Sequence, residues 1–128
     1  ISHCGDFAAA IVSRNSRVGI DIEIPVEKIS MLMHKFLSAN EHGVFNLLPG
    51  VSNSSASDIF QEPTLLWSAK EAVFKWYADG AVDFRRQIQL LKQDEATETI
   101  DCLFSKNGTE LTIHYRRFGH LVLAWVVS

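Results

Sequence analysis

The segment from Leu65 to Trp76 constrains the fold most, because it has the pattern of a helix that is apolar on two sides. At 100° per residue, one face of this helix carries five apolar residues: Leu65, Ala69, Ala72, Val73 and Trp76. Trp67 and Phe74 fall nearly opposite that face. An ordinary surface helix has one apolar stripe and leaves its other side to solvent. The sequence therefore predicts a helix that is covered on both sides.

A narrow polar strip separates the two apolar sides, and it contains Ser68, Glu71 and Lys75. Glu71 and Lys75 are one helical turn apart and can touch. An ordinary ion pair on the surface would explain them. An acid and a base in the remaining gap of a covered helix would also suit one wall of a binding site. The choice depends on whether other reactive side chains meet this gap.

Composition is that of an ordinary globular domain. The chain has 128 residues, of which 47% are hydrophobic and 21% charged, enough for one domain with a real core. Its net charge of −3 argues against nucleic acid as the main partner. Apolar runs fall far short of the ~20 residues that a membrane helix needs, and we expect no membrane contact. Two cysteines without metal or disulfide spacing favour the cytoplasm.

Residues 18–24 give the clearest strand pattern, because apolar residues alternate there with small or acidic ones. One face consists of Val18, Ile20, Ile22 and Ile24, and the other of Gly19, Asp21 and Glu23. Residues 7–13 are expected to form a short buried strand. Four further strands are expected at 87–91, 99–105, 111–116 and 121–127, with a hairpin turn at Asn107–Gly108.

Helical patterns are expected at 26–36 and 39–48, where Ser38 and Asn40 are candidate N-caps. Residues 49–57 have the composition of a surface loop. The helix around Trp67 is expected to end near Asp79–Gly80, with the glycine in a left-handed conformation. Antiparallel strands with helices between them predict an α+β domain, an antiparallel sheet with helices packed on one face.

Asp21 and Glu23 are the first candidate site residues. At positions i and i+2 of a strand, their carboxylates project from the same face. Two hard oxygen donors suit Mg²⁺ better than zinc or calcium when phosphate oxygens and water complete the shell. The alternative is a pair of charges on the solvent face of a strand. Glu71 could complete a metal site or act as a general base.

Basic residues provide the remaining candidates. Lys75 could neutralise charge that develops on a phosphoryl group. Lys70 could reach a phosphate or extend its ammonium to solvent without a function. His3, assisted by Ser2, could hydrogen-bond a phosphate or be an ordinary loop histidine.

Three segments, Ile1–Asp6, Val18–Glu23 and Trp67–Lys75, together resemble the 4′-phosphopantetheinyl transferases. The similarity is to the surfactin-synthetase-activating (Sfp-like) class. Its signatures are a Ser-His-Ser/Cys-Gly strand start, a Gly-Ile-Asp-Ile-Glu strand and a Trp-Ser-x-Lys-Glu helix with a later lysine. Phe36-Leu37-Ser38 followed by Glu41 also looks like the family's segment between the second and third signatures.

The resemblance implies Mg²⁺-dependent transfer of phosphopantetheine from coenzyme A to a serine of an acyl or peptidyl carrier protein, leaving 3′,5′-ADP. Asp21, Glu23 and Glu71 would hold the metal, and Glu71 would also accept the serine proton. Lys75 would stabilise the breaking pyrophosphate. The residues expected to contact coenzyme A are Ser2, His3, Lys70 and Lys75.

Carrier contacts in the family fall between the second and third signatures, which implies Lys28, Met31, Lys35 and Phe45 here. Because Ser2-His3 precedes Asp21, the chain resembles the C-terminal lobe of a pseudo-symmetric, two-lobe transferase, with residues 1–128 as one domain and the N-terminal lobe absent. The surface left by the missing lobe could support a homodimer. The alternatives are a non-catalytic lobe that binds a carrier or partner, and an unrelated Mg²⁺-dependent phosphoesterase.

Overall fold

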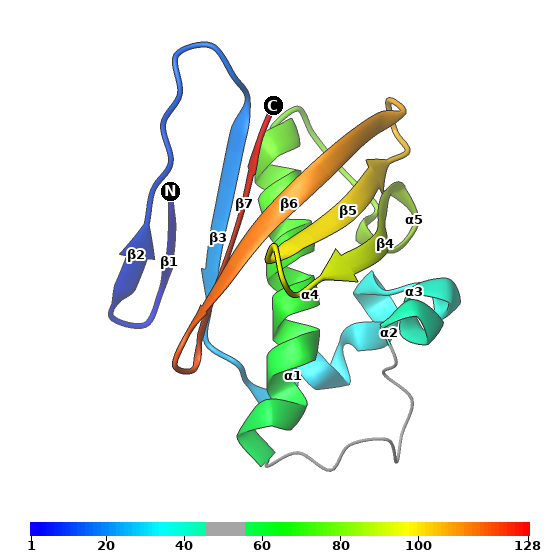
Figure 1. Ribbon diagram of the computed structural model, residues 1–128. Coiled ribbons are helices and arrows are strands. Elements are labelled where there is room, and N and C mark those ends of the chain that lie inside the picture. Colours follow the sequence, from blue (N-terminus) through cyan, green and yellow to red (C-terminus); the bar gives the residue numbers. More distant parts are fainter. Residues whose placement is uncertain (46–55) are drawn as a thin grey trace.

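The computed structural model of the protein describes residues 1–45 and 56–128, and for residues 56–60 the backbone alone. Its centre is a five-stranded antiparallel sheet in the order β3-β7-β6-β5-β4. The strands are β3 (Val18–Glu23), β4 (Ile88–Asp94), β5 (Thr99–Phe104), β6 (Thr109–Phe118) and β7 (Leu121–Val127). The long helix α4 (Ala56–Tyr77) crosses one face of this sheet (Figure 1). The predicted α+β class is confirmed.

The alternation predicted for residues 18–24 is also confirmed, and the carboxylate face is the one that meets α4. In the β3–β7 register, Asp21 lies opposite Ala124, and Ala124 belongs to the core that α4 covers. Asp21 is consequently buried. The solvent-face interpretation of this strand is wrong, because a helix covers the acidic side.

Gly19 allows the close approach of β3 to α4. A Cβ added at this position would lie 2.1 Å from the backbone oxygen of Ala72 and 2.5 Å from the backbone nitrogen of Trp76. Only a residue without a side chain fits between this strand and this helix. Gly19 therefore sets the spacing at which Asp21, two residues further along, meets α4.

Helix α4 is covered on both sides, as the sequence predicts. Leu65, Ala69, Ala72, Val73 and Trp76 pack on the sheet and are buried. The opposite side is half-buried by two other parts of the chain: Trp67 contacts Phe36 of α2 (Met33–Phe36) at 5.1 Å between ring centroids, and Phe84 at 5.5 Å. Phe74 also contacts Phe84. Residues from both before and after α4 in the chain thus provide this cover.

Three short helices complete that side: α1 (Glu27–Met31), α3 (Ala39–Val44) and α5 (Phe84–Gln87). The helix predicted at 26–36 is divided at Leu32 into α1 and α2. Ser38 is the N-cap of α3 and forms a capping box with Glu41, whereas Asn40 lies inside the helix and caps nothing. Helix α3 ends at Val44 with Phe45 as its C-cap, and residues 46–48 of the predicted helix lie outside the described residues.

Two other expectations are corrected. The strand predicted at 7–13 is only β2 (Phe7–Ala9), which is largely exposed and forms a separate two-stranded sheet with β1 (Ser2–Cys4). Helix α4 ends at Tyr77, and Ala78 follows it directly with a left-handed φ of 59°. Gly80 also has a positive φ, 122°, but it does not cap the helix. Of the loop predicted at 49–57, the last two residues already belong to α4, and the others lie outside the described residues.

No helix in the described part of the chain combines the length and apolarity that crossing a membrane requires.

Candidate functional site

Asp21 is the centre of a polar cluster between β1, β3 and α4. Its Oδ1 accepts hydrogen bonds from Ser2 Oγ at 3.2 Å and from Lys75 Nζ at 2.9 Å. Its Oδ2 is buried and has no hydrogen-bond partner in the described structure. A buried carboxylate oxygen without a partner is costly, and such atoms in native proteins often await a ligand or ion. Asp21 therefore has one oxygen fixed by Ser2 and Lys75 and one buried oxygen without a hydrogen-bond partner among the described residues.

Glu23 and Glu71 add two further carboxyl groups to this cluster. The pKa of Glu23 rises from 4.5 to about 8, mainly because burial disfavours its charge and also because Asp21 repels it. The pKa of Glu71 is raised by burial and by Asp21, and Lys75 partly offsets the rise. Glu71 contributes to the rise at Glu23 as well. The three predicted metal ligands thus influence one another electrostatically, and Lys75 offsets part of their repulsion.

Lys75 is the cation of this cluster, but it pairs with Asp21 and not with Glu71, the partner that the sequence suggested. Its Nζ forms an ion pair with Asp21 across the strand–helix interface, and no ion pair within 4.0 Å links it to Glu71. The side chain is 33% exposed, against 3% for Asp21. Lys75 can therefore reach both the buried carboxylate and a ligand at the surface.

The donor set fits a divalent cation of the Mg²⁺ type. The ligand chemistry consists of carboxylate oxygens, one of them buried and unpartnered, and a cation would relieve the mutual repulsion that raises the pKa values of Glu23 and Glu71. No three Asp, Glu, His or Cys side chains of the described residues already surround a single point at ligand distances. Side-chain adjustments would be needed to bring these three together around an ion.

Ser2 and His3 point in opposite directions from β1, as neighbours on a strand must. Ser2 is buried; besides its bond to Asp21, its Oγ accepts a hydrogen bond from the backbone N–H of Ile22 at 3.1 Å. His3 is exposed. Ser2 thus orients Asp21 and joins β1 to β3, and of the two only His3 is available to a ligand from solvent.

The structure gives Lys70 a role that differs from the predicted one. Its side chain is completely buried, and its Nζ donates to Glu41 Oε1 at 2.9 Å and to the backbone oxygen of Phe84 at 2.7 Å. Burial lowers the pKa of Lys70, and Glu41 opposes that effect. Lys70 neither extends to solvent nor faces Asp21, so contact with coenzyme A is not supported in this arrangement.

The residues predicted to contact a carrier divide into two groups. Lys28, Met31 and Lys35 are exposed on α1 and α2. Phe45 is buried in the hydrophobic core, where it supports α3. Phe45 must therefore be removed from any contact surface.

The sequence did not predict the contacts of two further buried polar residues, Ser68 and Glu41. Ser68 is buried and donates from Oγ to the backbone oxygen of Asp21 at 3.3 Å, so it joins α4 to the strand that carries the acids. Its position in the polar strip beside Glu71 was the available signal. Glu41 pairs with Lys70 inside the protein, and only its capping-box spacing from Ser38 marked it in the sequence.

Comparison with known proteins gives consistent matches. The family model described as the 4′-phosphopantetheinyl transferase superfamily matches residues 17–126. Enterobactin synthase component D of Salmonella typhi is 32% identical over 122 residues, which cover 89% of this chain and 41% of that protein. Enterobactin synthase component D of Salmonella typhimurium (strain LT2) is 36% identical over 87 residues, or 62% of this chain and 31% of that protein. The chain thus spans about two fifths or less of the length of these curated relatives.

Proposed function

Because the chain belongs to the 4′-phosphopantetheinyl transferase superfamily, we propose that it carries the catalytic acids of an enzyme that moves phosphopantetheine from coenzyme A to a serine of an acyl or peptidyl carrier protein. The observation that supports this best is the mutual electrostatic influence of Asp21, Glu23 and Glu71, together with the Lys75–Asp21 ion pair and the unpartnered oxygen of Asp21. A lone surface ion pair would not need three acids around it.

The reaction exchanges the phosphoanhydride bond of the pyrophosphate for a phosphate ester bond to serine. The serine oxygen attacks the phosphorus that bears the pantetheine arm, and the bond from that phosphorus to the bridging oxygen of the pyrophosphate breaks. Adenosine 3′,5′-bisphosphate leaves with that bridging oxygen. The protein mainly has to neutralise developing negative charge and position the reacting groups. Cationic and proton-accepting side chains therefore provide most of the catalysis.

Glu71 is the proposed acceptor of the serine proton, directly or through water. Its raised pKa brings it closer to neutral pH, where a general base is most effective. Lys75 is proposed to stabilise the negative charge on the leaving group, since its partly exposed ammonium can turn from Asp21 toward a bound pyrophosphate. His3, exposed on β1, is proposed to contact a phosphate of coenzyme A.

Mg²⁺, held by Asp21, Glu23 and Glu71, would supply additional positive charge against the pyrophosphate. The relation of the chain to the longer relatives supports treating it as one lobe of a larger enzyme, and a homodimer that replaces a second lobe remains part of the proposal.

Mass spectrometry tests the proposal. The full-length gene product, an apo carrier protein, coenzyme A and Mg²⁺ should yield a carrier one phosphopantetheine heavier, together with adenosine 3′,5′-bisphosphate, and chelation of the metal should stop the transfer. Glu71→Gln and Asp21→Asn should each lower the rate at least a hundredfold, whereas Glu110→Gln, an exposed acid on β6, should not. Full activity of both site variants would contradict the assignment. Release of inorganic phosphate instead would favour a phosphoesterase, and binding of the carrier without transfer would favour a non-catalytic lobe.

A further inference from the structure

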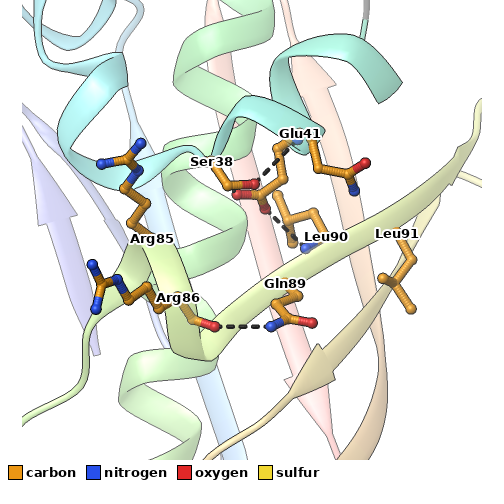
Figure 2. A pocket seen from close by; sticks show the side chains of 8 residues that line it. Ser38, Glu41, Arg85, Arg86, Gln89, Leu90 and Leu91 are labelled. Atoms are coloured by element: carbon orange, nitrogen blue, oxygen red, sulfur yellow. Dashed lines mark hydrogen bonds between the residues drawn. The ribbon is translucent and has the colours of Figure 1, made fainter.

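A groove of about 470 Å³ lies between α3 on one side and α5 with the first half of β4 on the other, separate from the carboxylate cluster. Its rim includes Asn40, Arg85, Arg86 and Leu91, and its floor includes Glu41. Figure 2 shows the two arginines on one side of the groove and Leu91 on the other. The volume is within the range of sites that bind a ligand or a few side chains of a partner.

The two arginines present their charge without a partner among the side chains that the structure describes. Asp83 fixes the backbone of α5 by accepting hydrogen bonds from the N–H groups of Arg85 and Arg86 at 3.0 and 3.2 Å. Neither guanidinium forms an ion pair or hydrogen bond with any residue whose side chain the structure describes. Both side chains are exposed, while the short helix that carries them is held in place.

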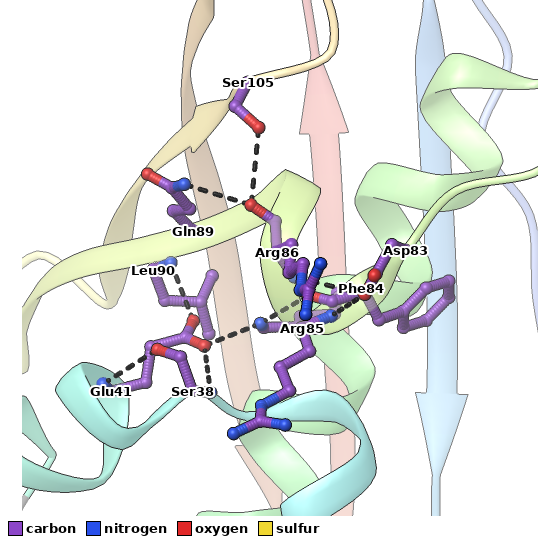
Figure 3. Close-up of polar contacts among 10 residues, drawn as sticks. Ser38, Glu41, Asp83, Phe84, Arg85, Arg86, Gln89, Leu90 and Ser105 are labelled. Carbon is purple, nitrogen blue, oxygen red and sulfur yellow. Dashed lines mark hydrogen bonds and ion pairs between the residues drawn. The ribbon is translucent and has the colours of Figure 1, made fainter.

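The acid in the floor of the groove does not neutralise these arginines, because its own partners satisfy it (Figure 3). Glu41 Oε1 accepts from Lys70 Nζ at 2.9 Å and from the backbone N–H of Ser38 at 2.8 Å. Its Oε2 accepts from the backbone N–H of Leu90 at 2.9 Å. Asp83 remains as a nearby acid, engaged with backbone N–H groups. The groove thus carries excess positive charge in a chain whose net charge is −3.

Neighbouring residues add further positive charge and an apolar surface to the groove. Helix α2, which carries the exposed Lys35, packs against α5. Leu91 is 46% exposed and gives the groove an apolar side. Cationic groups next to an exposed apolar side chain match a partner segment that has acidic residues and an apolar face.

The groove is connected to the proposed catalytic acid by a layer of aromatic rings. Phe84, directly before Arg85, contacts both Trp67 and Phe74 of α4. Glu71 lies between those two aromatics in the sequence, one turn from each. A protein bound in the groove would therefore lie against these aromatic rings, on the side away from Glu71.

We propose that this groove binds an acidic segment of the carrier protein that receives the phosphopantetheine group, with Arg85 and Arg86 as the specificity-determining contacts. Guanidinium groups bind carboxylates in a planar, two-point geometry that suits this task. The inference rests on the proposed function for the identity of the partner. On this proposal, Phe45 is not a carrier contact. The carrier would instead contact the two arginines of α5 and the exposed Leu91 of β4, next to Lys35.

Steady-state kinetics of the full-length gene product with the Arg85→Glu/Arg86→Glu double variant test this groove. The KM for an apo carrier protein should rise at least tenfold, with kcat and the KM for coenzyme A within twofold of wild type. Arg116→Glu and the single variant Arg85→Glu are compared as equal charge reversals, since Arg116 is exposed on the opposite face of the sheet from α4. Raising the salt concentration should weaken carrier binding more for wild type than for the double variant, because the contacts are ionic.

Calorimetric titration with the apo carrier, without coenzyme A, separates this inference from the proposed function. Tenfold weaker binding by the double variant, with normal binding by Arg116→Glu, would support the groove even if no transfer were detected. A carrier KM and affinity unchanged by the double substitution would overturn it even if transfer proceeded normally. An equal loss in the Arg116→Glu control would also overturn it, since the effect would then reflect net charge alone.

Discussion

Lys75 on α4 forms its ion pair with Asp21 on β3, at 2.9 Å between Nζ and Oδ1, and not with Glu71 one turn back along its own helix. The contact joins the two elements that carry the candidate site. It leaves Glu71 without a bonded cation, so that the raised pKa of this group is only partly offset. The helix and the strand are thus coupled through the residues proposed to handle the pyrophosphate.

Lys75→Met should destabilise the protein by about 1–2 kcal/mol in the absence of divalent metal, because Asp21 then keeps a buried charge with Ser2 as its remaining side-chain partner. The value lies below the cost of breaking a fully buried pair, since Lys75 is partly exposed. Urea unfolding measures the loss. Added Mg²⁺ should restore most of the stability by supplying the missing charge. If Mg²⁺ did not restore the lost stability, the metal site would be contradicted. Lys92→Met is the control, because it removes an exposed lysine and should have little effect on stability.

Glu23 should make stability depend on pH. Its pKa is about 8 in the folded protein against 4.5 ordinarily, so between these values the folded protein holds a proton that the unfolded chain has lost. The free energy of unfolding should therefore fall as pH rises from about 4.5 to 8 and level off above that. Glu23→Gln should flatten this decline in urea titrations at pH 5.5, 7 and 8.5. A variant with the same slope as wild type would show that Glu23 titrates normally.

The same proton gives a signature of metal binding. Because Mg²⁺ binds the ionised carboxylate, its stabilising effect should be larger at pH 8.5 than at pH 6. Thermal unfolding with and without the metal at both values measures this difference, and Glu23→Gln should lose it.

The sequence predicts much of this site, and the reasons for its successes and failures are physical. The period-two pattern of β3 identifies the shared face of Asp21 and Glu23, and the period of α4 identifies its two apolar sides, because both depend on local geometry alone. Which face of β3 is covered depends on Gly19, whose missing side chain admits the helix. That consequence appears only when the strand and helix are packed together.

Lys70 and Phe45 show which contacts could not be predicted from the sequence. A lysine in an apolar helix can reach solvent or find a buried acid, and the choice for Lys70 depended on Glu41, 29 residues away in the chain. Phe45 follows a short helix whose orientation, and hence whose buried side, is set by that ion pair and by the bond from Leu90 to Glu41. Long-range polar contacts of this kind leave no periodic signal.

The buried Lys70–Glu41 pair should be much more important for stability than a surface pair. Lys70→Met should cost about 3–5 kcal/mol, because it leaves a buried carboxylate uncompensated. Combining it with Glu41→Gln should cost less than the sum of the two single changes, by about 0.5–3 kcal/mol in a double-mutant cycle. Arg17→Met breaks the exposed pair with Asp79 and should cost under about 1 kcal/mol. Additive effects of the two buried substitutions would argue against direct coupling.

The two cysteines should differ sharply in reactivity. Burial raises the pKa of Cys102 to about 12, so almost none of it is thiolate at neutral pH, whereas Cys4 is partly accessible on β1. A thiol reagent should therefore modify one cysteine in the native protein and the second only after unfolding. Cys4→Ser should abolish the native reaction. Rapid modification of Cys102 in that variant would indicate that the sheet and α4 open readily.

Gly19→Ala provides the most direct test of how the site is assembled. The added methyl group would overlap the backbone of α4 at Ala72 and Trp76, and neither strand nor helix can yield without separating. We expect a loss of about 3 kcal/mol or more in urea unfolding, together with a weaker Mg²⁺ effect, since Asp21 would move away from Glu71. Gly43→Ala is the control: its Cβ meets nothing within 4 Å in helix α3, so the change should be neutral or stabilise by up to about 1 kcal/mol. If Gly19→Ala were as stable as Gly43→Ala, the close approach of β3 to α4 would be wrong, and with it the geometry that brings the three carboxylates together.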